Sequence, residues 1–226
     1  MPPTLSRSLA AEALGTYCLV FAGTGAIIAN ADGAVSHVGV ALSFGLVVFI
    51  MVSALGDVSG AHLNPAVSLG LCLARRFPAQ RLLPYVLAQC AGALLASLTL
   101  RALFPQHPTL GATTPSGPVH QSWVMELLLT AGLMFVILSV TTGAKEKGIT
   151  AGLAIGSVIA LEALFAGPIS GASMNPARSL APACVSGQWA SLWVYLTAPT
   201  LGAALAIPAC RLVRGPDQPA NPEDPQ

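Results

Sequence analysis

Long apolar runs dominate this chain, and most of them are as long as a helix that crosses a lipid bilayer. No charged side chain interrupts residues 13–31, 33–56, 82–100, 127–144 or 179–210. A bilayer core requires roughly 20 mostly apolar residues from a spanning helix. We therefore predict six spanning helices, over about residues 9–29, 38–55, 82–104, 123–142, 148–166 and 189–212.

One polar segment interrupts this pattern twice. Residues 59–70 read SGAHLNPAVSLG and residues 170–181 read SGASMNPARSLA, with eight of twelve positions identical at an offset of 111 residues. Each half of the chain therefore contains three spans, with the polar segment between its second and third span. Because three is an odd number, the second half enters the membrane from the opposite side, which predicts an inverted repeat over about residues 8–104 and 121–213.

The repeated segment carries the signals of a helix start. Asn is a good N-cap residue and Pro is tolerated at the first helical position, so helices should begin at Asn64 and Asn175. The apolar runs that follow, to about residues 74 and 185, are too short to span a bilayer and predict half-helices. Two half-helices from opposite faces would meet near the midplane with their positive N-terminal ends together. The non-helical chain before them is tolerated at that depth only where it is buried or lines water, which implies a pore.

Composition and charge agree with a membrane protein. Hydrophobic residues make up 54% of the 226 residues and charged residues only 8%, and the mean hydropathy is +0.72. The net charge of +1 gives no reason to expect a nucleic-acid partner. With six spans, eight of the ten Lys and Arg residues fall on one side of the membrane, which predicts that both termini are cytoplasmic.

Nothing in the sequence indicates an enzyme or a metal protein. No segment brings together a nucleophile, a base and an orienting group, so we expect no catalytic residue. The five cysteines lie in or beside apolar runs without the spacing of a metal site or a disulfide framework, so we expect free thiols, no metal and no cofactor.

The motifs now define a resemblance. The paired Asn-Pro-Ala motifs, Arg178 directly after the second, and Glu12 and Glu126 near the starts of spans one and four resemble the aquaporin (major intrinsic protein) family over nearly the whole chain. The resemblance implies an all-α membrane protein, an aquaporin-like bundle of six transmembrane helices plus two re-entrant half-helices, usually a homotetramer in lipid with one pore per subunit. We expect one channel domain over residues 1–214 and a disordered cytoplasmic tail over residues 215–226.

The resemblance also implies roles for individual residues. The two asparagine amides should donate to a passing water or hydroxyl, while the half-helix dipoles oppose a cation at the same point. Glu12 and Glu126 should accept from backbone N–H groups of the re-entrant segments. The expected motif residues are Asn64, Pro65, Ala66, Asn175, Pro176 and Ala177, and the expected pore-lining backbone belongs to Gly60, Ala61, His62, Leu63, Gly171, Ser173 and Met174.

Selectivity in the family depends on four positions at the outer constriction. Counted from the motifs, these are Phe44, Ala163, Ala172 and Arg178. Water-specific relatives typically carry His where this chain has Ala163, so the two alanines leave room for solutes larger than water. Residues 164–182 and 192–196 are similar to the nodulin-like intrinsic proteins of plants and their bacterial relatives, which conduct glycerol and undissociated metalloid acids. Ser179 stands where dedicated glycerol facilitators typically carry Asp, which argues against strict glycerol specialisation.

The resemblance therefore predicts a passive channel for water and small uncharged solutes such as glycerol, arsenite or boric acid, which excludes ions and protons, in a bacterial inner membrane. A water-selective aquaporin is the first alternative. An ion-coupled secondary transporter is a distant one, because it would need a charged coupling site at the midplane, where only the asparagines are polar. We expect His62 to make an interhelical hydrogen bond, with gating by its protonation as the alternative. We expect Glu162 to be buried against the backbone of the second re-entrant segment, with a position close to the outer constriction as the alternative.

Overall fold

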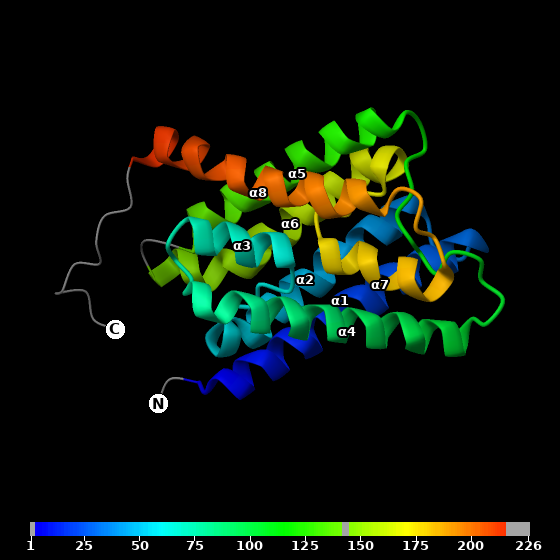
Figure 1. Ribbon diagram of the computed structural model, residues 1–226, viewed down its shortest axis with the longest axis horizontal. Helices are drawn as coiled ribbons and strands as arrows, with labels where there is room; N and C mark the ends of the chain where they lie inside the picture. Colours follow the sequence, from blue (N-terminus) through cyan, green and yellow to red (C-terminus); the bar gives the residue numbers. More distant parts are fainter. Residues whose placement is uncertain (1–2, 142–144, 216–226) are drawn as a thin grey trace.

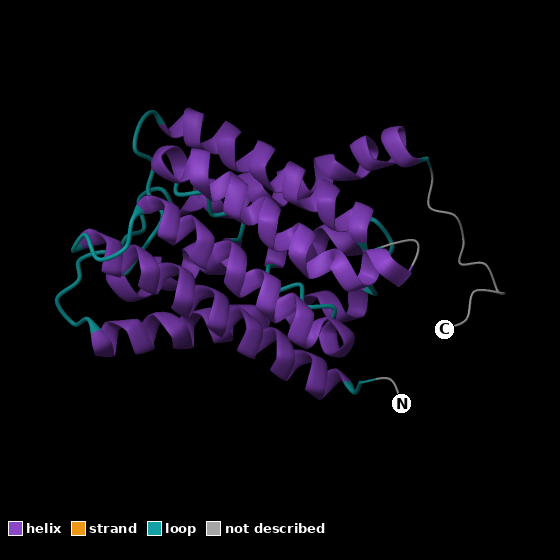
Figure 2. Cartoon of the chain, turned by 180° about the vertical axis from the view of Figure 1, so that it is seen from behind, coloured by secondary structure: helices purple, strands orange, loops and turns teal. Residues whose placement is uncertain are grey.

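The computed structural model describes residues 3–141 and 145–215, and this part of the chain is helical and contains no strand (Figure 2). Six of its helices are long and apolar enough to cross a membrane. The elements are α1 (Leu5–Ala31), α2 (His37–Ser59), α3 (Pro65–Leu73), the 3-10 turn η1 (Ala79–Arg81), α4 (Leu82–Leu103), α5 (Val119–Val140), α6 (Lys145–Ser170), α7 (Pro176–Ser186) and α8 (Leu192–Arg214). The predicted all-α architecture of six spans and two half-helices is confirmed.

Several boundaries differ from the prediction, and local chemistry explains them. Helices α1, α2 and α6 extend beyond the predicted spans at both ends. Polar N-caps start the first two earlier, since the hydroxyl oxygens of Thr4 and Ser36 each accept a backbone N–H one turn into the helix. Helix α8 begins three residues later than predicted, because Trp189 belongs to a turn whose carbonyl accepts the N–H of Leu192. The predicted tail lies outside the described residues except for Gly215.

The two halves of the chain repeat the same close helix contacts. Helix α1 packs against α2 and α4, and α5 packs against α6 and α8. A Cβ on Gly92 of α4 would lie 2.0 Å from the carbonyl oxygen of Ala13, and a Cβ on Gly202 of α8 would lie 2.2 Å from that of Leu127. Only glycine permits these approaches, and small residues serve this purpose at helix contacts within lipid. Across the halves, α2 packs against α6.

The half-helices α3 and α7 enter the bundle from opposite ends and face each other near its middle (Figure 1). Asn64 and Asn175 are their N-caps, and each is followed by Pro at the first helical position. The start of α1 and the end of α8 lie at one end of the bundle, whereas the connection between α4 and α5 lies at the other (Figure 1). Each half thus contributes one helix N-terminus to the centre.

Candidate functional site

A buried carboxylate anchors the re-entrant segment of the first half. Glu12 of α1 is fully buried. Its Oε1 accepts from the hydroxyl of Ser59 (2.7 Å) and the backbone N–H of His62 (2.9 Å), and its Oε2 accepts from the backbone N–H of Leu63 (2.7 Å) and the amide of Gln89 (2.8 Å). Four donors compensate this charge for its loss of water.

The second half repeats the arrangement around Glu126 of α5, which is also fully buried. Its Oε1 accepts from the hydroxyl of Ser170 (2.8 Å) and the backbone N–H of Ser173 (2.8 Å), and its Oε2 accepts from the backbone N–H of Met174 (2.7 Å). No side-chain amide in the described part of the chain takes the place that Gln89 has in the first half. The two carboxylates therefore hold equivalent turns with unequal sets of donors.

These anchors hold the backbone in an unfavourable conformation. Non-glycine residues with positive φ are costly, and such strain persists only where the surrounding structure imposes it. The φ values are 84°, 45° and 51° at Gly60, Ala61 and Leu63, and 88°, 42° and 54° at Gly171, Ala172 and Met174. The N–H groups of His62 and Ser173 in these segments bond to the buried carboxylates instead of to helical carbonyls.

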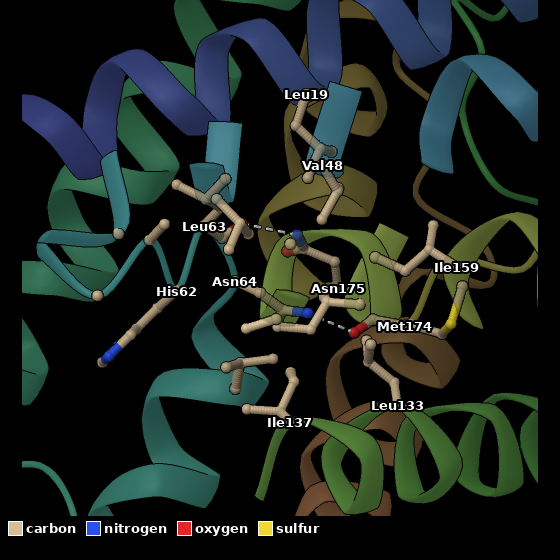
Figure 3. Close-up of a pocket in the computed structure, with 18 of the residues that line it drawn as sticks. Leu19, Val48, His62, Leu63, Asn64, Leu133, Ile137, Ile159, Met174 and Asn175 are labelled. Carbon is tan, nitrogen blue, oxygen red and sulfur yellow. Dashed lines mark hydrogen bonds between the residues drawn. The ribbon is translucent and has the colours of Figure 1, made fainter. Parts of the chain in front are cut away.

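The two asparagines cross-link the halves at the centre. Nδ2 of Asn64 donates to the carbonyl of Met174 (2.7 Å), and Nδ2 of Asn175 donates to the carbonyl of Leu63 (2.8 Å) (Figure 3). The Oδ1 atoms accept from the backbone N–H groups of Ala66 (2.9 Å) and Ala177 (3.0 Å). An amide nitrogen carries two hydrogens, so each asparagine keeps one donor for a molecule beside it.

Both asparagines line a cavity of about 610 Å³. Apolar side chains that include Leu19, Val48, Leu133, Ile137 and Ile159 surround the asparagine pair (Figure 3). The remaining lining residues are Phe44, Val52, Ser53, Gly56, Asp57, Gly60, Ala61, His62, Leu63, Val67, Leu71, Thr141, Ala151, Gly152, Ile155, Ala172, Ser173, Met174 and Arg178. The cavity therefore combines a polar strip from the re-entrant segments with apolar walls from the long helices.

One end of the cavity carries a cation. Arg178 is buried, its Cζ lies 5.1 Å from the centroid of the Phe44 ring, and its Nη1 donates to the carbonyl of Gly111 (2.9 Å). Nε and Nη2 have no hydrogen-bond partner among the described residues. A buried guanidinium at a cavity wall repels a second cation, and its two unpaired donors are themselves buried.

The structure brings most of the predicted site residues to this cavity, but not all of them. Phe44, Ala172 and Arg178 line it together, whereas Ala163 is buried on α6 without reaching it. Ala163 carries only a methyl group, and Ile159, one turn earlier on the same helix, supplies the wall instead. Gly171 is also absent from the lining, whereas Ser173 and Met174 contribute to it.

Two expectations about polar side chains were wrong. His62 bonds through Nδ1 to the hydroxyl of Ser68 (3.0 Å), which belongs to the half-helix of its own re-entrant segment and not to a spanning helix. Glu162 is buried, but it makes no hydrogen bond to the second re-entrant segment, and its Oε2 has no partner within residues 3–141 and 145–215. Its carboxyl group packs instead against Gly132 of α5. A small residue on α5 leaves space for it there.

The sequence alone did not reveal several supporting contacts. The carbonyl of Gly111 that holds Arg178 carries no sequence signal, because every residue has a carbonyl. The hydroxyl of Thr113, which donates to Ser179 (2.8 Å), lies in a connection with no recognisable pattern. Gln89 could have been found, since an amide within an apolar span is expensive unless it has a partner. No group of three or more metal-ligating side chains occurs in the described ranges.

Comparisons with known proteins agree with this geometry. The family model described as Major intrinsic protein matches residues 2–208. The chain is 49% identical to "Aquaporin NIP1-1" of Zea mays over 216 residues, which cover 94% of this chain and 77% of that protein. It is 43% identical to "Nodulin-26" of Glycine max, with 95% and 80% covered. The X-ray structure of the aquaglyceroporin from Plasmodium falciparum matches with a TM-score of 0.81 and 28% identity, over 93% of this chain and 99% of that one.

Proposed function

Because this chain belongs to the major intrinsic protein family, we propose that it is a passive membrane channel that conducts water and small uncharged solutes and excludes ions and protons. The observation that carries the proposal is the pair of asparagines at the two half-helix N-termini, each with one amide hydrogen free beside the cavity. These donors attract an oxygen atom, while the positive helix ends oppose a cation at the same place. A solute that passes must therefore be neutral and offer a lone pair.

The proposed solute class follows from the side chains that line the cavity around Arg178. Phe44 and Arg178 supply a flat apolar face and a donor, Ala172 supplies only a methyl group, and the methyl group of Ala163 does not reach the cavity. We propose that polyols of the size of glycerol and hydroxides such as arsenite or boric acid fit beside water, since each presents hydroxyl oxygens to the guanidinium and carbon or metalloid to the ring. The similarity to the aquaglyceroporin from Plasmodium falciparum supports this class.

The surroundings of the channel are proposed on the same basis. Six apolar helices make the chain an integral multi-pass membrane protein. We propose that four copies assemble in lipid, as is usual for the family, with both termini cytoplasmic in a bacterial inner membrane. The start of α1 and the end of α8 lie at the same end of the bundle (Figure 1), which supports a common side for the termini.

Parallel measurements of solute entry test the proposal. Purified protein in proteoliposomes should accelerate light-scattering responses to water, glycerol and arsenite gradients relative to protein-free vesicles of the same lipid. Entry of water alone would establish the water-selective alternative and reject the proposal that glycerol and metalloid hydroxides pass. No acceleration for any of the three would reject the channel itself.

A further inference from the structure

The connection between α4 and α5, residues 104–118, holds the arginine of the cavity in place. Its Gly111 carbonyl is the acceptor for Nη1 of Arg178 (2.9 Å). Leu110 and Gly111 both have positive φ, 51° and 72°. Leu110 is fully buried against Ile28 and Leu100. The turn that presents this carbonyl is thus fitted closely to the bundle and strained at a non-glycine residue.

One imidazole stabilises this turn. The backbone N–H of Leu110 donates to Nδ1 of His107 (2.9 Å). Nδ1 accepts a hydrogen bond only in the neutral tautomer that carries its proton on Nε2, because protonated imidazole donates from both nitrogens. His107 is partly exposed, so solvent protons reach it. The connection that contains it lies at the end of the bundle opposite the start of α1 (Figure 1).

A guanidinium fixes the position of this histidine. Nη1 of Arg101 donates to the carbonyls of Pro105 (3.0 Å) and His107 (3.1 Å), and Nη2 donates to that of Val185 at the end of α7 (3.4 Å). Arg101 is the cation of this network, and no carboxylate is hydrogen-bonded or ion-paired to His107 among the residues described. Arg178 lies beyond Gly111. A proton on His107 therefore gains no direct negative partner.

We propose that His107 is a positioning residue for Arg178: its neutral Nδ1 holds the turn that carries the Gly111 carbonyl, and acid on that side of the membrane releases it. Protonation would place an N–H against the N–H of Leu110 and leave both donors without an acceptor. The strained turn then relaxes, and Arg178, whose Nε and Nη2 are already unpaired, loses the acceptor for Nη1. The freed guanidinium occupies the cavity, and flux falls. This inference rests on the proposed channel function.

Substitutions at His107 separate the hydrogen bond from the proton. In H107N, the amide oxygen branches from Cγ as Nδ1 does, so it accepts from Leu110 but does not titrate near neutral pH. In H107A, no acceptor remains at any pH. The control is H120N, because His120 is exposed at the start of α5 at the same end and makes no hydrogen bond to the 104–118 connection.

The measurement is glycerol entry into proteoliposomes at about pH 7.5 and about pH 5.5, with equal pH on both sides. Because acid removes the acceptor for the Leu110 N–H, we expect wild-type flux to be at least about fivefold lower at the lower pH than at the higher one. H120N should behave like the wild type. H107N should keep the flux of about pH 7.5 at both values, and H107A should be low at both.

Three outcomes would overturn the inference: a wild-type flux independent of pH, a pH response retained in H107N, or wild-type behaviour of H107A. A second readout does not depend on transport. With ¹⁵N-labelled histidine in nanodiscs, the Nδ1 signal that H107N removes should have the chemical shift of an unprotonated nitrogen at about pH 7.5 and should move on acidification. A protonated Nδ1 at about pH 7.5 would reject the role of His107 even if the protein conducts no solute. An absence of flux at about pH 7.5 would reject only the proposed channel function.

Discussion

At the scale of single residues, the buried guanidinium of Arg178 makes a single hydrogen bond to the described part of the chain, to the Gly111 carbonyl. We expect Arg178→Val to keep the entry of neutral solutes and to raise the permeability to protons, because the fixed repulsive charge is gone. Pyranine-loaded proteoliposomes measure this leak directly. Arg178→Lys is the matched control, because it keeps the charge and should stay tight. An unchanged leak in the valine variant would show that exclusion depends on the half-helix ends alone.

The size of the side chain at Ala163 is expected to affect which solutes pass. A histidine at this position should extend toward Phe44 and fill space that a three-carbon polyol requires, while it offers water a donor. We expect Ala163→His to reduce glycerol and arsenite entry at least about tenfold, equivalent to roughly 1.4 kcal/mol of barrier, with a much smaller loss of water permeability. Ala163→Ser adds only a hydroxyl and should resemble the wild type. Equal losses for water and glycerol would place the new ring outside the solute path.

Replacing the buried acids Glu126 and Glu162 by leucine should affect the stability of the protein differently. Glu126 accepts three hydrogen bonds, so Glu126→Leu orphans buried donors and should cost roughly 3–5 kcal/mol of stability. Oε2 of Glu162 has no partner in the described structure, so Glu162→Leu should be neutral or stabilising by about 1 kcal/mol. Thermal unfolding in detergent, followed by tryptophan fluorescence, compares them. A large loss for Glu162→Leu would reveal a partner that binds this carboxyl.

At the scale of elements, the sequence predicted what local signals encode. The lengths of the uncharged runs predicted the six spans, and the Asn-Pro pairs predicted the starts of α3 and α7. Both signals are local, because span length and N-capping depend on residues that are close together in the sequence. The connection between α4 and α5 was not predicted, since its conformation depends on contacts with α1 and α7 that are distant in sequence. For the same reason, the partners of Glu162 and His62 were assigned incorrectly.

Helix packing gives a test at this scale. A Cβ on Gly202 would lie 2.2 Å from a backbone oxygen of α5, so Gly202→Ala should force α8 away and destabilise the protein by roughly 1–3 kcal/mol. Gly25→Ala is the matched control, because the nearest atom to its new Cβ is a leucine methyl at 3.6 Å. In the interior of α1 it should gain about 0.5–1 kcal/mol. Equal melting temperatures for the two variants would mean that α5 and α8 pack less closely than described.

At the scale of the whole molecule, one continuous cavity passes the meeting point of the two halves. A channel of this kind lets a solute equilibrate but cannot concentrate it. We expect labelled glycerol to reach the external concentration inside proteoliposomes and to stop there, whether or not a proton or sodium gradient is imposed. Accumulation above the external concentration, driven by either gradient, would show that the protein is an ion-coupled transporter and not a passive channel.

The crossed bonds between Asn64 and the Met174 carbonyl, and between Asn175 and the Leu63 carbonyl, also bear on how the protein is made. A ribosome delivers the first half before residue 174 exists, so the strained turn before α3 is synthesised without the acceptor that its asparagine requires. Until the second half is inserted, the amide of Asn64 must donate its hydrogen bond to water or to the insertion machinery. The re-entrant segment of the first half therefore stays incomplete, and the hydrogen bond from Asn64 can form only after Met174 has been synthesised.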